Sequence, residues 1–254
     1  MDAAGRKAWL DNLLLSSLSR LEATEETCAL TIDGLEEESG RSVVDFANWE
    51  KKNAPYVLPA DVKAFYSAFN GLGVGYQVEI AGKLVSVGEM RLNKLEALGR
   101  VALEGTFPKM NWPKVDKAVC QGGRSDSFVL DLKTSAAFTI DSSLEIGDVV
   151  LLYRVPDIHD DAGGGGNRWK GLSSSPYEDP EVWFQDISAR WHFVCSSFTN
   201  FMRLMVAHLG VYGWHLAYTQ EGLPTETIHW MGLFCRERVC VDVSHNARQS
   251  QGFF

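Results

Sequence analysis

The sequence predicts an α+β fold: a twisted, largely antiparallel sheet of about five or six strands, flanked by N-terminal and C-terminal helices. Apolar residues recur at helical spacing near both ends of the chain, whereas short alternating segments separated by turn residues fill its middle. No linker divides two separate hydrophobic patterns. We therefore expect one domain over residues 1–243 and a mobile tail over residues 244–254.

Two helices are predicted before the sheet. The first is an amphipathic helix over residues 3–23, whose apolar face comprises Trp9, Leu10, Leu13, Leu14, Leu18 and Leu21. Charged residues within this segment distinguish it from a signal peptide. The lack of a targeting signal favours a cytosolic location. Residues 27–32 alternate weakly, as a strand would, and a further helix is expected over residues 42–51.

A short helix with a large aromatic face is predicted between Trp49 and Gly71. Pro59 fits its first turn, where a missing N–H costs nothing, and the Asp61 carboxylate meets the positive end of the helix dipole. The positions that share one helical face are Val62, Phe65, Tyr66 and Phe69. Asn70 and Gly71 then end the helix, because glycine adopts the left-handed conformation without steric cost.

The predicted strands follow this helix. Residues 74–87 read as a hairpin with its turn at Ala81-Gly82, and further strands are expected at residues 128–132, 137–140, 149–153 and 181–186. Residues 157–180 contain four consecutive glycines and three consecutive serines. We interpret this segment as a flexible insertion between strands rather than a domain boundary.

The last part of the chain is expected to be mainly helical. A long helix is predicted over residues 193–209, with an apolar face made by Val194, Phe198, Phe201, Met205 and Leu209. Pro224 is suited to open a last helix. Residues 239–243 are compatible with a short closing strand before the tail.

Charge and composition exclude several classes of partner. The formal net charge is -9, whereas non-specific binding to nucleic acid needs a basic surface. No apolar run reaches the roughly 18 residues of a membrane span, so no membrane insertion is expected. The five cysteines form no C-x-x-C pair and are typical of reduced cytosolic thiols.

Motifs for catalysis or cofactor binding are not found. The sequence has no P-loop and no G-x-S-x-G nucleophile elbow, so we expect no catalytic residue, no cofactor and no metal. The densest ligand-like cluster, residues 157–161, lies in the glycine-rich insertion, where ordering costs entropy. Asp186 and His192 are the least implausible acid/base pair, although a structural histidine is the simpler interpretation.

The eight tryptophans are a more informative feature. Trp49, Trp183 and Trp191 lie beside inward-facing runs and are expected in the core. The remaining tryptophans are harder to bury together, and exposed aromatic residues are typical anchors of protein–protein contacts. We expect partner-facing rings among Trp214, Trp230 and Trp169.

Two blocks of the sequence carry a family resemblance. The first contains Trp49, Leu58, Pro59, Asp61, Phe65, Tyr66, Asn70 and Gly71, and it resembles the N-terminal motif of the SUKH superfamily. The second runs from Trp183, Phe184, Asp186 and Trp191 through Phe198-Thr199 to Trp214. Together the blocks resemble the family of tubulin polyglutamylase complex subunit 2, over roughly residues 49–230.

The resemblance implies a non-catalytic scaffold or targeting subunit. Its partners would be other subunits of the complex, including an ATP-dependent ligase of the tubulin–tyrosine-ligase-like family, with tubulin or microtubules met indirectly. Its location would be the cytoplasm and cytoskeleton: microtubules, and the cilium, basal body or centrosome. Two alternatives stay open. One is a SUKH-type regulatory module that occludes a partner enzyme, as immunity proteins do; the other is an unrecognised enzyme that uses Asp186 and His192 or the cluster at residues 157–161.

Overall fold

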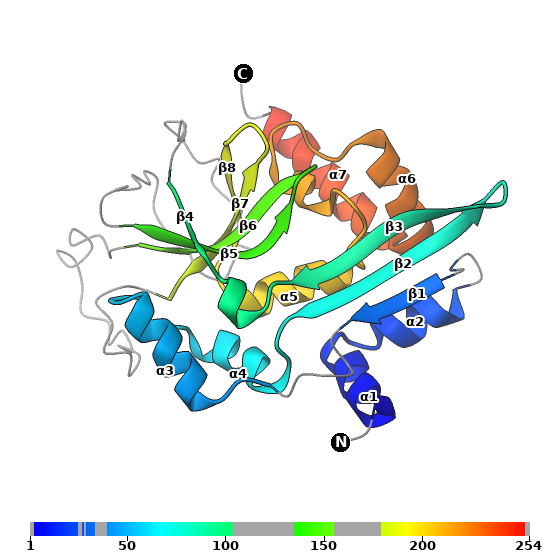
Figure 1. Ribbon diagram of the computed structural model, residues 1–254. Coiled ribbons are helices and arrows are strands. Elements are labelled where there is room, and N and C mark those ends of the chain that lie inside the picture. Colours follow the sequence, from blue (N-terminus) through cyan, green and yellow to red (C-terminus); the bar gives the residue numbers. More distant parts are fainter. Residues whose placement is uncertain are drawn as a thin grey trace, which may run out of the picture.

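Strand pairing divides the β-structure into two antiparallel sheets (Figure 1). The computed structural model describes residues 3–24, 27, 29–33, 40–103, 135–154 and 179–251. One sheet has the order β1-β2-β3, and its strands are β1 (Ala29–Asp33), β2 (Leu72–Ile80) and β3 (Lys83–Leu92). The other has the order β4-β5-β6-β7-β8, comprising β4 (Arg100–Val101), β5 (Ala136–Ser143), β6 (Gly147–Tyr153), β7 (Glu181–Asp186) and β8 (Trp191–Cys195).

The α+β class and the antiparallel pairing are therefore confirmed, with two sheets where the sequence suggested one. The predicted hairpin is β2–β3, and its turn residues Ala81 and Gly82 have φ angles of 50° and 77°. Positive φ at both central positions matches the right-handed twist of the flanking strands. The strand expected at residues 128–132 and the insertion at residues 157–180 lie outside the described residues, apart from the last two positions of the insertion.

The helices lie at both ends of the chain and between the sheets (Figure 1). The α-helices are α1 (Ala3–Leu13), α2 (Ser17–Ala23), α3 (Val43–Lys52), α4 (Ala60–Ala68), α5 (Phe198–Ala207), α6 (Thr225–Phe234) and α7 (Arg236–Gln251). The described residues also include the short 3-10 helices η1 (Leu95–Ala97) and η3 (Trp214–Tyr218). In the described part of the chain, no helix combines the length and apolar character that crossing a membrane requires.

The single N-terminal helix expected over residues 3–23 is wrong. The chain breaks between α1 and α2, where Leu15 and Ser16 have φ angles of 53° and 61°. The Asp11 carboxylate accepts hydrogen bonds from the backbone N–H groups of Leu18 and Ser19, at 2.8 and 3.2 Å. These are two of the donors that a helix start leaves unpaired, so Asp11 stabilises a second helix start.

The prediction for the last part of the chain is wrong at two points. Residues 191–195 form β8, so the expected helix over residues 193–209 begins only at α5, where the Ser197 hydroxyl caps it by accepting from the Asn200 N–H. The strand expected at residues 239–243 is part of α7. That helix also runs to Gln251, well into the segment expected to be a mobile tail.

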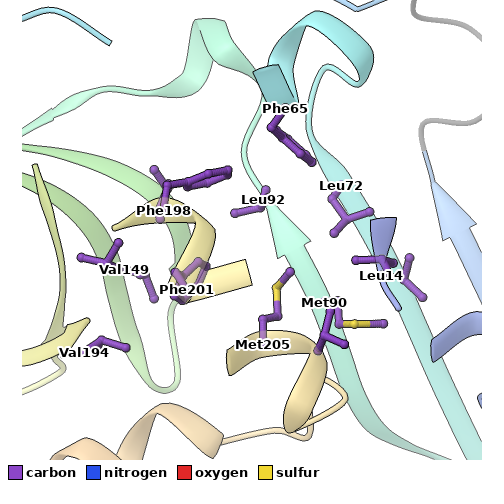
Figure 2. Close-up of a cluster of buried hydrophobic side chains, with 14 of the residues drawn as sticks. Leu14, Phe65, Leu72, Met90, Leu92, Val149, Val194, Phe198, Phe201 and Met205 are labelled. Carbon is purple, nitrogen blue, oxygen red and sulfur yellow. The ribbon is translucent and has the colours of Figure 1, made fainter. Parts of the chain in front are cut away.

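The main core lies where the two sheets meet around α5 (Figure 2). Side chains from the three-stranded sheet, such as Met90 and Leu92, face Phe198, Phe201 and Met205 of α5. Successive residues of β6 alternate between this core and a second cluster on the other face of the sheet, made by Ala137, Val150, Leu152, Trp183 and Trp191. The central strands of the five-stranded sheet are thus buried on both faces.

Removing the Phe201 ring from this core should destabilise the fold. Phe201 is fully buried, so Phe201→Ala should lower the free energy of unfolding by about 3–5 kcal/mol. Val43→Ala, at an exposed position of α3, is the matched control and should change it by less than about 0.5 kcal/mol. Urea denaturation of both variants measures the difference, and equal losses would contradict the placement of α5.

Candidate functional site

The first sequence block clamps the connection between the two sheets. The Tyr66 hydroxyl donates to the Asn93 carbonyl at 2.6 Å, and the Trp49 indole N–H donates to the Leu98 carbonyl at 3.3 Å. Asn70 makes two bonds, because its Oδ1 accepts from the Leu95 N–H at 2.9 Å while its Nδ2 donates to Glu96 at 3.1 Å. The groups that these three side chains contact all belong to residues 93–98, the connection between β3 and β4.

Backbone geometry explains the glycine that ends this block. Gly71 has a φ angle of 98°, in the region that favours glycine. A Cβ atom there would lie 3.0 Å from the Leu92 carbonyl oxygen. The turn after α4 can therefore approach the end of β3 closely, which brings Asn70 within reach of the connection.

The two sequence blocks meet in space. Asp61, in the first turn of α4, accepts hydrogen bonds from both the N–H and the hydroxyl of Thr199 at 2.9 Å, which places a carboxylate at the start of α5. The Phe65 and Phe198 rings pack 5.6 Å apart. Pro59 precedes α4 as predicted, and Leu58 is buried beside it. The first block therefore has a structural role in this fold.

The second block places its aromatic residues in the core and its carboxylate in a turn. Trp183 and Trp191 are buried, as expected, and Phe184 is buried beside them. Asp186 closes the β7–β8 turn, because its Oδ1 accepts from the backbone N–H groups of Ser188 and Arg190 at 2.8 and 3.0 Å. Its Oδ2 accepts from Arg190 Nε at 2.9 Å.

The structure also brings Asp186 and His192 together, as an acid/base pair would require. His192 Nε2 lies 3.1 Å from Asp186 Oδ2. Burial would raise the pKa of the Asp186 carboxyl, but hydrogen bonds from the Arg190 backbone, His192 and the Ser188 backbone outweigh it and lower that pKa. A carboxylate held in its ionised form by backbone donors is suited to fixing a turn and poorly suited to accepting a proton.

The tryptophans expected to face a partner do not share one surface. Trp214 is 1% exposed and stacks on His208 at 4.5 Å, so the expectation that its ring is presented to a partner is wrong. The reason is a buried network beneath it, in which Asp242 on α7 lies 2.8 Å from His208. Trp230 is half-buried against the main core, and Trp169 lies outside the described residues.

Two adjoining clefts form a surface that sequence reasoning missed. They have volumes of about 380 and 350 Å³ and share Glu145 and Ile146 in the β5–β6 turn. We call this region the hairpin-tip surface and define it by Leu144, Glu145, Ile146, Ile187 and Tyr212. Apolar residues between the predicted elements, such as Leu144 and Ile187, were the available signal, because connections between strands normally carry polar residues.

His215 lies in the wall of the second cleft, where its ring stacks on Phe184 and Trp214. Its Nδ1 is buried and has no hydrogen-bond partner among the described residues. Burial, followed by His208 and Arg91, lowers the pKa of His215 to about 3. The imidazole is therefore neutral at physiological pH.

Within the described ranges, no group of three or more His, Cys, Asp or Glu side chains is placed to hold a metal ion. The acidic cluster at residues 157–161 lies outside those ranges. Cys195 and Cys235 are buried, and Cys240 is exposed on α7.

Comparison with known proteins relates the chain to one subunit of a tubulin-modifying complex. A rat (Rattus norvegicus) protein named tubulin polyglutamylase complex subunit 2 is 28% identical over 238 residues, which cover 91% of this chain and 73% of the relative. The mouse (Mus musculus) protein of that name matches to the same extent. The human (Homo sapiens) protein is 26% identical over 193 residues, or 74% of this chain and 58% of the relative.

The chain is similar to tubulin polyglutamylase complex subunit 2 over most of its length. The resemblance carried by the two sequence blocks is thereby confirmed for that subunit. No family model matches the chain, and no solved structure matches it. Its placement in the SUKH superfamily accordingly stays a prediction.

The Asn70 clamp can be tested by its two bonds separately. Asn70→Leu leaves the buried Leu95 N–H without an acceptor and should lower the free energy of unfolding by about 1–3 kcal/mol. Glu96→Gln alters the more exposed side of the same contact and should cost less than about 1 kcal/mol. Thermal or urea unfolding of both variants makes the comparison, and a larger loss for Glu96→Gln would contradict the clamp.

His215 should make stability depend on pH. Its folded-state pKa of about 3 lies below the ordinary value of 6.5, so the unfolded chain takes up the proton first and stability falls as pH drops below 6.5. Between pH 7 and pH 5 the free energy of unfolding should fall by roughly 1–2 kcal/mol, because one titrating group changes it by at most about 1.4 kcal/mol per pH unit. His215→Phe keeps an aromatic ring and should remove that part of the slope in urea titrations, whereas an unchanged slope would refute the assignment.

Proposed function

We propose that this chain is a non-catalytic scaffold and targeting subunit of a tubulin polyglutamylase complex. In this role it supports ATP-dependent glutamylation of tubulin by a separate ligase subunit of the tubulin–tyrosine-ligase-like family. The observation that carries the proposal is the similarity to proteins named as subunit 2 of that complex across 91% of the chain. The proposed setting is the cytoplasm and cytoskeleton, at microtubules and the cilium, basal body or centrosome.

The contacts of the second block support a structural role for its one acid/base-like pair. Both carboxylate oxygens of Asp186 accept hydrogen bonds within the β7–β8 turn. The His192 side chain is buried, and its ring stacks on Phe184 with the ring centroids 6.0 Å apart. A general acid or base must reach a substrate proton while its pKa lies near the working pH. The Asp186 carboxyl has its pKa lowered instead, which favours the ionised form at all physiological pH values.

Scaffolding requires a rigid frame that displays a surface for partners. The clamps around α4 hold the two sheets together through long-range hydrogen bonds and aromatic contacts. The hairpin-tip surface displays exposed apolar side chains on that frame. Exposed apolar groups beside clefts are typical of protein interaction sites.

Co-expression tests the proposal directly. The tagged full chain, expressed with the other subunits of the complex, should co-purify with a tubulin–tyrosine-ligase-like enzyme, and the assembly should ligate glutamate to tubulin when ATP is added. The chain alone should show no ligation. Ligation by the purified chain would overturn the non-catalytic role, and a single captured enzyme of another kind, inhibited by the chain, would favour the immunity-like occluding module.

A further inference from the structure

The hairpin-tip surface is formed by two turns that the strand pairing brings side by side. In β5–β6, Ser143 pairs with Gly147, and Gly147 in turn pairs with Asp186 at the end of β7. The β5–β6 and β7–β8 turns therefore lie next to each other at one end of the five-stranded sheet (Figure 1). Glu145 and Ile146 from the first turn and Ile187 from the second line the same cleft.

Gly147 shows how closely these turns are joined. It has a φ angle of 133°, and a Cβ atom there would lie 2.0 Å from the Gln185 carbonyl oxygen. The first turn therefore rests directly on the backbone of β7. The spacing of the side chains on the two tips is set by the sheet and does not depend on the loops alone.

The apolar side chains of this surface are unusually exposed for their size. Leu144 is fully exposed, Ile187 is 71% exposed and Tyr212 is 43% exposed. Single exposed apolar residues are common, but here they line two adjoining clefts together with Ile146 and Leu223. Such a surface fits apolar anchors of another chain, which would gain by leaving water.

The charge of the surface restricts which chain fits. Five carboxylates line the two clefts: Glu89, Asp141, Glu145, Asp186 and Glu221. Two guanidinium groups stand against them, those of Arg91 and Arg190. Neither arginine is available as an anion site, because each is already paired with two of the carboxylates: Arg91 with Asp141 and Glu89, and Arg190 with Asp186 and Glu221.

Glu145 sits at the centre of this arrangement. It is shared by both clefts, and its carboxylate makes no ion pair with any described residue. The surface thus combines exposed apolar groups with an excess of negative charge. Its complement is a segment with apolar side chains flanked by lysine or arginine, since complementary charge steers association and rejects partners of like charge.

We propose that the hairpin-tip surface is a docking site for a protein segment that carries apolar anchors flanked by basic residues. The inference rests on the proposed function, because it assumes that the chain acts by binding other proteins. It adds the chemical character of one partner segment. It also excludes glutamate-rich segments from this surface, because their carboxylates would face Glu145, which no described cation pairs with. A polyglutamylated substrate tail must therefore be bound elsewhere in such an assembly.

The first test uses three fluorescent helical peptides of equal length and the full chain. One carries leucine and lysine, the second leucine and glutamate, and the third serine and lysine at the same positions. Fluorescence anisotropy at physiological ionic strength should show the leucine–lysine peptide binding at least about tenfold more tightly than either of the others. Equal binding of the leucine–lysine and leucine–glutamate peptides would overturn the proposal.

Variants then locate the binding. Leu144→Asp and Ile187→Asp should each weaken binding of the leucine–lysine peptide about tenfold or more. Val43→Asp places the same charge at an apolar position of α3 that is 81% exposed, and it should leave binding unchanged. Loss of binding in the Val43 variant, or none in the other two, would show that the peptide binds another surface.

A charge reversal guards against variants that merely misfold. Glu145→Lys should lower the affinity for the leucine–lysine peptide and raise the affinity for the leucine–glutamate peptide. A damaged fold would not produce the second effect. The melting temperature of this variant, like those of the aspartate variants, should stay close to that of the parent chain, because these side chains are exposed. Failure of the leucine–glutamate peptide to gain affinity would overturn the electrostatic half of the proposal.

The co-expressed complex supplies the last test. A photo-crosslinking residue at position 144 should trap a segment of another subunit with apolar residues flanked by lysine or arginine, whereas the same group at position 43 should not. Crosslinking to an acidic segment would overturn the proposal. If the peptides bind as expected but no polyglutamylase subunit co-purifies, the proposed function fails while the docking proposal stands. If a polyglutamylase subunit co-purifies but the leucine–lysine peptide shows no preference, the docking proposal fails while the proposed function stands.

Discussion

The contact between α4 and α5 holds the rest of the structure in place. Asp61 and Thr199 are 138 positions apart, yet the carboxylate of one accepts both the N–H and the hydroxyl of the other. Phe65 and Phe198 pack beside them in the main core (Figure 2). Because α4 also ends in the clamp on the connection between β3 and β4, one helix fixes both the core and the relation of the two sheets.

A second contact ties the segment after α5 to the three-stranded sheet. The segment after α5 lies along β3, with the Glu89 N–H donating to the Gly210 carbonyl at 2.8 Å and the Tyr212 N–H donating to the Val87 carbonyl at 3.0 Å. A Cβ atom on Gly88 would lie 2.7 Å from the Gly210 oxygen, so the two backbones approach as closely as glycine allows. This approach places Tyr212 and His215 in the wall of the second cleft.

In this fold the polar residues of the two sequence blocks stabilise the frame, and the frame displays the exposed apolar residues of the hairpin-tip surface. Asp186 illustrates the division, because its carboxylate closes the turn that carries the exposed Ile187. This arrangement suits the proposed docking role, since a binding surface on a rigid support loses little conformational entropy when a partner binds.

Elements whose signals lie between neighbouring residues could be predicted from the sequence. Pro59, Asp61 and the apolar spacing up to Phe69 were sufficient to predict α4, and Ala81-Gly82 was sufficient to predict the β2–β3 turn. The family resemblance also lay in local blocks of sequence, and similarity to subunit 2 confirmed it. Propensity, capping and periodicity act over a few residues, so they can be read without knowing the fold.

Features that depend on contacts between distant residues could not be predicted in this way. Residues 191–195 form a strand because β7 pairs with them, and Trp214 is buried because His208 and Asp242 meet beneath it. Likewise, Leu144 and Ile187 share a surface only because Gly147 pairs with Asp186. Pairing partners and burial are set by contacts between segments far apart in the chain, which local patterns do not encode.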